Sequence, residues 1–227
     1  MALDTATFKT RTATAIIFAI VMLAGLLLNR WSFIILFTII HLGCWYEYLK
    51  LMRRIRSVHP LVYLAWGLLY ITMPVCTMIS LRLGVITMTS SVPGWYLKVI
   101  PCGIIFSIWI NDTMAYITGS FLGKTPLSKI SPKKTWEGTA GGAILAVLVI
   151  TLIGWWTKIY TLTNWIVISA TGAVFGTVGD LLESKLKRLA GVKDSGSMLP
   201  GHGGFLDRFD SFLIAVPFVW CYVYFFM

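Results

Sequence analysis

The chain has 227 residues, of which 57% are hydrophobic and 12% are charged, and its mean hydropathy is +0.80. Soluble domains carry about a quarter charged residues, so this composition excludes an ordinary soluble protein and favours an all-α polytopic integral membrane protein. The net charge of +10 would suggest a nucleic-acid partner for a soluble protein. Because basic loops are usual in membrane proteins, we expect no nucleic acid as a partner.

Seven apolar runs are long enough to cross a bilayer as helices. They cover residues 12–28, 31–49, 60–81, 97–118, 138–157, 163–183 and 211–227. Only Asn29 and Arg30 separate the first two runs, which predicts a tight hairpin.

The basic residues are unevenly divided between the two ends of these spans. Fifteen of the nineteen Lys and Arg residues share a side with the N-terminus, and the other four are Arg30, Arg82, Lys98 and Lys158. This asymmetry predicts a cytoplasmic N-terminus and an outside C-terminus. All nine acidic residues also fall at the cytoplasmic ends, or in the cytoplasmic halves, of the predicted spans. Any chemistry is therefore expected at that face.

Two polar features precede the fifth apolar run. Asn111 and Asp112 interrupt the run of residues 97–118. An ionisable residue inside a span is a functional candidate, although a structural hydrogen bond to another helix explains it equally well. The next segment, residues 119–137, is rich in groups that suit phosphate binding: Lys124, Ser131, Lys133, Lys134, Thr135 and Glu137.

The segment from Asp180 to Asp210 concentrates the charges of the chain. It holds five of the nine carboxylates and five of the nineteen basic residues, between two apolar runs. A helix that continues past Gly179 would place four polar side chains on one face: Asp180, Glu183, Ser184 and Lys187. Asp207 and Asp210 repeat the i, i+3 spacing where the last run begins.

The two pairs of carboxylates indicate a metal site. Mg²⁺ takes oxygen ligands and is commonly bound by one or two carboxylates together with substrate phosphates. Ordinary salt bridges to neighbouring basic residues are the alternative. We favour Mg²⁺ and leave a second metal position open.

The basic residues complement these acids. Lys124, Lys133, Lys134, Lys187, Arg188, Lys193 and Arg208 could neutralise phosphate groups. Contact with anionic lipid head groups is the alternative. His202 lies in the sequence Gly201-His202-Gly203-Gly204, where it could contact phosphate, carry a proton or hold the loop.

The pattern of residues 184–210 resembles the defining motif of the CDP-diacylglycerol synthases, or phosphatidate cytidylyltransferases. It runs from Ser184-x-Leu-Lys187-Arg188 through Lys193-Asp194-x-Gly196 to His202-Gly-Gly-Phe-x-Asp207-Arg208-Phe-Asp210. Residues 112–119, 131–138 and 179–184 are also similar to the family, so the resemblance covers about the C-terminal half of the chain.

The resemblance implies an enzyme that makes CDP-diacylglycerol and pyrophosphate from CTP and phosphatidic acid, with Mg²⁺. It implies that Asp180 and Asp207 hold the metal, with Asp210 and Glu183 as further ligands or close neighbours. Residues 97–227 are then the catalytic region, with cytoplasmic loops at 119–137 and 184–210, and residues 1–96 are a lipid-facing scaffold.

We assign a role to each candidate residue on this basis. The catalytic candidates are Asp180, Asp207, Asp210, Lys193 and Arg208. The substrate-binding candidates are Asn111, Asp112, Lys124, Ser131, Lys133, Lys134, Thr135, Glu137, Ser184, Lys187, Arg188, His202, Gly203 and Gly204. We expect a multi-pass protein of a bacterial cytoplasmic membrane with its active site on the cytoplasmic side, in contact with membrane lipid. A homodimer is left open.

Other classes of protein are less well supported. A transporter would place ionisable groups near the bilayer midplane at a repeat interface, whereas here they gather at one face and no repeat is evident. A non-catalytic scaffold would not need paired acids beside alternating lysines. The nearest rivals are other CTP-dependent lipid enzymes, such as a polyprenol or phytol kinase or an archaeol-type cytidylyltransferase. A kinase would release CDP rather than pyrophosphate.

Overall fold

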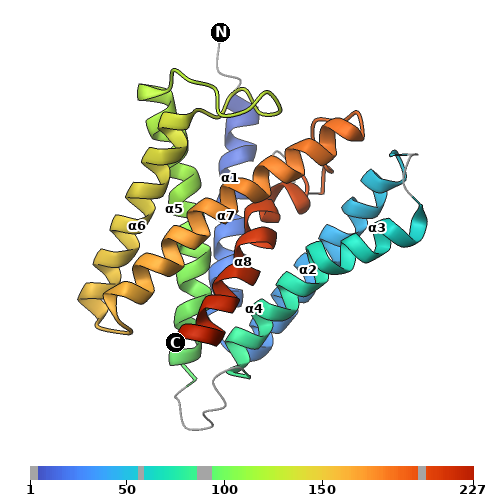
Figure 1. Cartoon of the computed structure of the whole chain (residues 1–227). Coiled ribbons are helices and arrows are strands. Elements are labelled where there is room, and N and C mark those ends of the chain that lie inside the picture. Colours follow the sequence, from blue (N-terminus) through green and yellow to red (C-terminus); the bar gives the residue numbers. More distant parts are fainter. Residues whose placement is uncertain (1–4, 56–58, 86–93, 199–202) are drawn as a thin grey trace.

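The computed structural model describes residues 5–55, 59–85, 94–198 and 203–227, with the side chains of residues 5–11 excepted. Within this part the regular structure is helical, apart from an isolated bridge between Pro126 and Thr135. Figure 1 shows the helices in chain order. They are α1 (Thr5–Leu27), α2 (Arg30–Met52), α3 (Pro60–Gly67), η1 (Leu68–Thr72), α4 (Met73–Leu83), η2 (Tyr96–Lys98), α5 (Val99–Leu122), α6 (Trp136–Thr157), α7 (Leu162–Leu189) and α8 (Leu206–Phe226).

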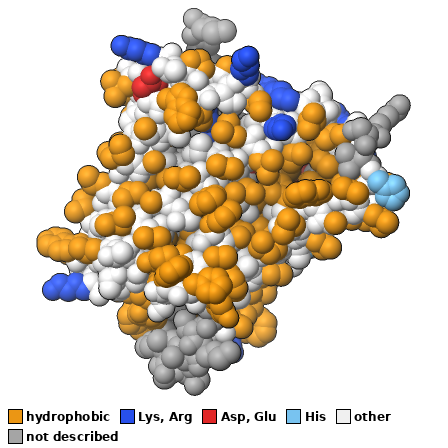
Figure 2. Space-filling view, viewed as in Figure 1, with side chains coloured by type: hydrophobic (Ala, Val, Ile, Leu, Met, Phe, Trp, Pro, Cys, Tyr) orange, Lys and Arg blue, Asp and Glu red, His pale blue; other side chains and the backbone are white. Residues whose placement is uncertain are grey.

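The predicted class of an all-α polytopic membrane protein is confirmed. Six helical stretches are long and apolar enough to span a membrane by length and composition, and Thr12–Leu27 is a shorter apolar helix. The stretches are Arg30–Met52, Pro60–Leu83, Tyr96–Leu122, Trp136–Thr157, Leu162–Leu189 and Leu206–Phe226. All seven predicted runs are therefore helical. The side chains agree, since apolar groups cover the middle of the visible face and most charged groups lie toward its ends (Figure 2).

The connections alternate between the two ends of the bundle. The first turns of α1, the α5–α6 connection, the end of α7 and the start of α8 lie toward one end in Figure 1. The α1–α2 and α6–α7 connections and the C-terminus lie toward the other. The two loops predicted to carry chemistry thus share one end. Which side of the membrane this end faces stays a prediction.

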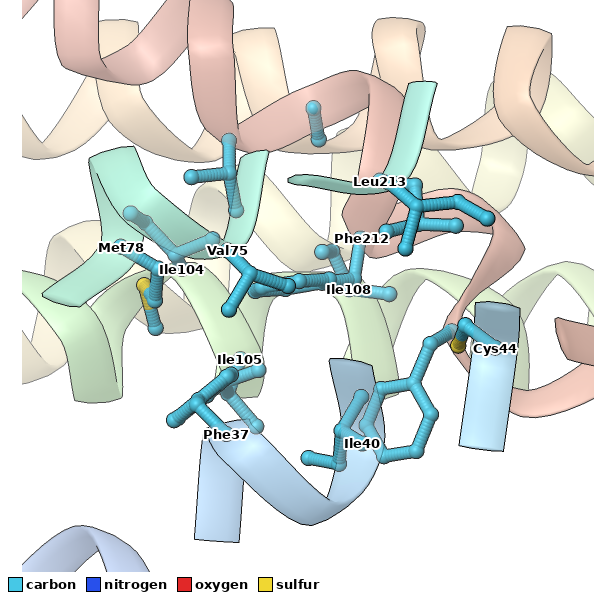
Figure 3. Close-up of a cluster of buried hydrophobic side chains, with 14 of the residues drawn as sticks. Phe37, Ile40, Cys44, Val75, Met78, Ile104, Ile105, Ile108, Phe212 and Leu213 are labelled. Carbon is cyan, nitrogen blue, oxygen red and sulfur yellow. The ribbon is translucent and has the colours of Figure 1, made fainter. Parts of the chain in front are cut away.

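The core joins the two halves of the chain. Figure 3 shows Phe37, Ile40 and Cys44 of α2 with side chains from α4, α5 and α8. The labelled partners are Val75, Met78, Ile104, Ile105, Ile108, Phe212 and Leu213. Apolar burial here fixes α8 against the N-terminal helices, and α8 begins at the charged segment of the chain.

Glycines let two pairs of helices, α7 with α8 and α6 with α5, approach each other closely. A side chain at Gly179 of α7 would collide with the Asp210 carbonyl oxygen of α8. A side chain at Gly142 of α6 would lie 2.7 Å from the Asn111 carbonyl oxygen of α5. Gly179, directly before Asp180, therefore brings α7 close to α8.

Candidate active site

The charged segment converges on Asp207, in the first turn of α8. Its Oδ2 atom accepts hydrogen bonds from the Ser195 backbone N–H (3.0 Å), the Ser195 hydroxyl (2.9 Å) and the Gly204 N–H (2.9 Å). Its Oδ1 atom lies 2.6 Å from the Lys187 ammonium. Asp207 thus ties the segment after α7 to the start of α8, and charge-assisted bonds of this kind are the stronger ones.

Lys187 holds a second carboxylate on its own helix. It forms an ion pair with Glu183, one turn earlier on α7, whose side chain is 1% exposed. The Glu183 oxygens have no hydrogen-bond partner besides this ion pair. A buried carboxylate needs a cation, so Lys187 is the compensating charge for both Glu183 and Asp207.

A second acid and lysine pair joins the α5–α6 connection to α7. The Lys134 ammonium, just before α6, lies 2.5 Å from Asp180 Oδ2 on α7. Ser184, one turn later, places its hydroxyl 3.4 Å from Asp180 Oδ1. The Asp180 side chain is 28% exposed, so the pair remains accessible from outside.

Asp210 and Asp112 lie near this pair. Asp210 is buried, and its Oδ1 atom accepts a hydrogen bond of 2.6 Å from the Ser211 N–H. Asp112 and Asp180 are both within electrostatic range of Asp210, as is Lys134. Acids from α5, α7 and α8 therefore come close to one another around one lysine.

The α5–α6 segment is organised by its own polar groups. Thr135 caps α6 by accepting a hydrogen bond from the Gly138 N–H at 3.1 Å. Glu137 accepts hydrogen bonds at 3.2 Å from the N–H groups of Lys124 and Thr125. In the structure both residues shape the loop that presents Lys134, and their predicted contact with substrate stays a prediction.

The remaining candidates take several positions. Lys124, Lys133, Arg188, Lys193 and Arg208 are exposed, and Arg208 is within electrostatic range of Asp112. Asn111 is buried. Its side-chain amide nitrogen lies 3.4 Å from Asp112 Oδ1, and its side-chain carbonyl oxygen has no hydrogen-bond partner. Ser131 is half-buried, and Gly203 adopts a positive φ of 83° beside Asp207. His202 lies outside the described residues.

Sequence reasoning missed two contributions from the N-terminal half. Glu47 of α2 is fully buried and accepts a hydrogen bond from Ser195. Lys50 and Arg54, assigned only to the charge asymmetry, line a cavity of about 190 Å³ beside Asp194. A lone carboxylate within residues 31–49 was a signal that could have been used.

The donor set fits a hard cation such as Mg²⁺. Asp180, Glu183, Asp207 and Asp210 supply only oxygen atoms, and Glu183 has carboxylate oxygens without a hydrogen bond. Among the described residues no group of three or more Asp, Glu, His or Cys side chains is placed so that it could hold a metal ion. Binding of Mg²⁺ by one or two of these carboxylates together with substrate phosphates therefore stays a prediction.

Comparison with known proteins places this segment in a family. The model of the cytidylyltransferase family matches residues 85–226. A phosphatidate cytidylyltransferase of Bacillus subtilis is 49% identical over 119 residues, which is 50% of this chain and 43% of that protein. One from Synechocystis is 46% identical over 123 residues, covering 51% and 40%. The chain thus matches less than half the length of these curated relatives.

A plant protein gives the same result. Phosphatidate cytidylyltransferase 5, chloroplastic, of Arabidopsis thaliana is 44% identical over 126 residues, which is 54% of this chain and 30% of the relative. The family match extends over more than half of the chain and contains the cluster around Asp180, Lys187 and Asp207. The chain therefore belongs to the cytidylyltransferase family.

Proposed function

We propose that this chain transfers CMP from CTP to phosphatidic acid, which yields CDP-diacylglycerol and pyrophosphate. The observation that carries the proposal is the set of two lysine and carboxylate clusters where α6, α7 and α8 meet. They lie within the stretch matched by the cytidylyltransferase family, and the relatives are named as phosphatidate cytidylyltransferases.

The proposed reaction needs no nucleophile from the protein. A phosphate oxygen of phosphatidic acid attacks the α-phosphorus of CTP and forms a new P–O bond. The bond from the α-phosphorus to the oxygen bridging it to the β-phosphorus breaks, and pyrophosphate leaves with the electron pair. Catalysis of such a transfer rests mostly on positioning and on neutralising charge.

The described residues offer what two anionic substrates require. Lys134 lies beside Asp180 with 30% of its side chain exposed, and Lys193 and Arg208 are exposed at the same end, while Lys187 neutralises Glu183 and Asp207. These groups would reduce the repulsion between the triphosphate and the lipid phosphate. Asp180, with Glu183, Asp207 and Asp210, would hold Mg²⁺, which when bound would neutralise charge on the phosphate groups.

The location follows from the same argument. The apolar spans would keep the two acyl chains of phosphatidic acid in the bilayer while its phosphate meets CTP at the charged end. With the positive-inside rule, this end faces the cytoplasm of a bacterial cell. We keep a homodimer as an open extension of the proposal.

Pyrophosphate release tests the assignment. Protein purified in detergent would be given CTP, phosphatidic acid and Mg²⁺, with pyrophosphate and the lipid product both measured. We expect release to require all three components, and we expect Asp180→Asn to reduce it by about a hundredfold, the scale of losing one preorganised electrostatic contact. Lys185→Gln is the matched control, because Lys185 is exposed on the same helix and belongs to no cluster.

Product identity separates the proposal from its rivals. CDP in place of pyrophosphate would indicate a lipid kinase. No product with phosphatidic acid, but pyrophosphate with an archaeol-type or another lipid phosphate, would overturn the substrate assignment and leave the family unaffected.

A further inference from the structure

Glu47 is a fully buried carboxylate in the half of the chain that the family match does not cover. It lies on α2, and its Oε2 atom accepts hydrogen bonds from the Ser195 hydroxyl (2.8 Å) and the Leu206 N–H (2.9 Å). Both donors belong to the segment between α7 and α8. Glu47 therefore contacts the site from a helix more than 140 residues away in sequence.

The contact with Leu206 supplies a helix cap from another helix. The first N–H groups of a helix have no partner within it, and Phe205 at the N-cap of α8 offers no side-chain acceptor. Glu47 accepts from the first residue of α8, and its negative charge stands where the helix dipole favours an anion. It thus fixes the turn of α8 that begins with Leu206 and Asp207.

The contact with Ser195 extends the same restraint to Asp207. The Ser195 hydroxyl lies 2.8 Å from Glu47 Oε2 and 2.9 Å from Asp207 Oδ2. One hydroxyl has one proton, so it donates to one of these oxygens at a time. Ser195 is consequently held between both carboxylates, while its backbone N–H also donates to Asp207.

Two glycines show how closely the backbone between α7 and α8 packs against Glu47. A side chain at Gly196 or at Gly204 would collide with the Glu47 carboxylate. Gly204 also donates its N–H to Asp207. The backbone can approach both acids only because these positions lack a Cβ atom.

We infer that Glu47 is a positioning residue for Asp207, acting through Ser195 and through the first turn of α8. The expected effect on catalysis rests on the proposed function. The expected effect on the structure of the α7–α8 segment rests only on the hydrogen bonds of Glu47. It assigns to the N-terminal helices a part in building the site, beyond contact with lipid.

The test compares Glu47→Ala with Glu47→Gln in the full chain. Glu47→Ala removes both acceptor bonds, and we expect kcat for pyrophosphate release to fall by about 10- to 100-fold, the range found when a partner that orients a functional ligand is lost. We also expect a higher Mg²⁺ concentration for half-activation and a KM for phosphatidic acid that changes less than kcat. Glu47→Gln keeps one acceptor oxygen, so it should recover most of kcat.

Ile40→Ala is the matched control. Ile40 is buried on the same helix but packs in the apolar core, so its truncation lowers stability without removing a hydrogen bond to the α7–α8 segment. Ser195→Ala should show a smaller loss of kcat than Glu47→Ala, because the Leu206 bond remains. Glu47→Gln as inactive as Glu47→Ala would overturn the hydrogen-bonding role.

Hydrogen exchange supplies a readout that does not depend on activity. In Glu47→Ala, amides of residues 203–210 should exchange faster while those of α6 keep their protection, and the 203–210 amides should exchange more slowly in Ile40→Ala than in Glu47→Ala. Unchanged exchange in Glu47→Ala would overturn the inference, even if activity falls. If the wild-type protein releases no pyrophosphate, the proposed function fails, and the exchange data still decide whether Glu47 holds the start of α8.

Discussion

The side chain of Lys187 lies between Glu183 on its own helix and Asp207 at the start of α8. We expect Lys187→Met to destabilise the fold by about 3 kcal/mol, because removing one partner of a buried pair leaves an uncompensated charge. The melting temperature of the detergent-purified protein, measured by scanning calorimetry, should therefore fall by several degrees.

A second substitution separates charge from packing. Glu183→Gln in the Lys187→Met background should recover part of the lost stability, since one of the two carboxylate charges that Lys187 neutralises is then gone. Lys185→Met is the control on the exposed side of α7. Equal melting temperatures for Lys187→Met and Lys185→Met would contradict the role of Lys187 as a buried counter-ion.

At this scale the sequence predicted which residues share one helix face better than it predicted their contacts. Spacing placed Asp180, Glu183 and Lys187 on one face of a helix, and the structure confirms that α7 extends to Leu189. Spacing could not show that Lys134, in the α5–α6 connection, pairs with Asp180 of α7, or that Glu47 of α2 caps α8. Both contacts join residues distant in sequence, and no local pattern encodes such pairs.

Among the elements, α5 and α6 depend on glycine for their contact. A methyl group on Gly142 would lie 2.7 Å from the Asn111 carbonyl oxygen and 2.8 Å from the Ala115 nitrogen. These are backbone atoms of α5 and cannot move without the helix. We expect Gly142→Ala to cost about 1–3 kcal/mol through overpacking and to lower activity, because Asn111 and Asp112 shift relative to Lys134.

Gly94→Ala provides the comparison for that substitution. No atom lies within 4 Å of the position that its methyl group would occupy, so the same chemical change should leave the melting temperature unaltered. A melting temperature for Gly142→Ala equal to that of the wild type would show that α5 and α6 do not pack at this distance.

Helix positions were predicted well and helix details poorly. All seven apolar runs are helical, because a backbone in lipid must satisfy its hydrogen bonds internally. The run of residues 60–81 contains a π-helical turn at Leu68–Thr72, which lies between Gly67 and Pro74 and which the apolar pattern did not predict. The last helix begins at Leu206, ahead of its apolar run of residues 211–227, because its charged first turn is stabilised by Glu47, Ser195 and Lys187 and does not need an apolar sequence.

At the scale of the whole molecule, the arrangement of the helices and the distribution of the charges bear independently on the location of the site. The fold gathers the α5–α6 connection and the start of α8 toward one end (Figure 1), and the positive-inside rule predicts that this end is cytoplasmic. Single cysteines can test the orientation in a background where Cys44, Cys76, Cys102 and Cys221 are replaced by alanine. Lys129→Cys reports on the α5–α6 loop, and Gly94→Cys reports on the residues just before α5; both positions are exposed.

In intact cells, a membrane-impermeant maleimide should label Gly94→Cys and leave Lys129→Cys unlabelled until the membrane is permeabilised. Equal labelling of both variants before permeabilisation would indicate leaky cells. Labelling of an endogenous cytoplasmic protein with a free thiol would reveal such leakage. The reverse pattern would place the acidic cluster outside, away from cytoplasmic CTP. Since the lysines and carboxylates of the site lie at one end only, orientation decides whether the proposed reaction can receive its nucleotide.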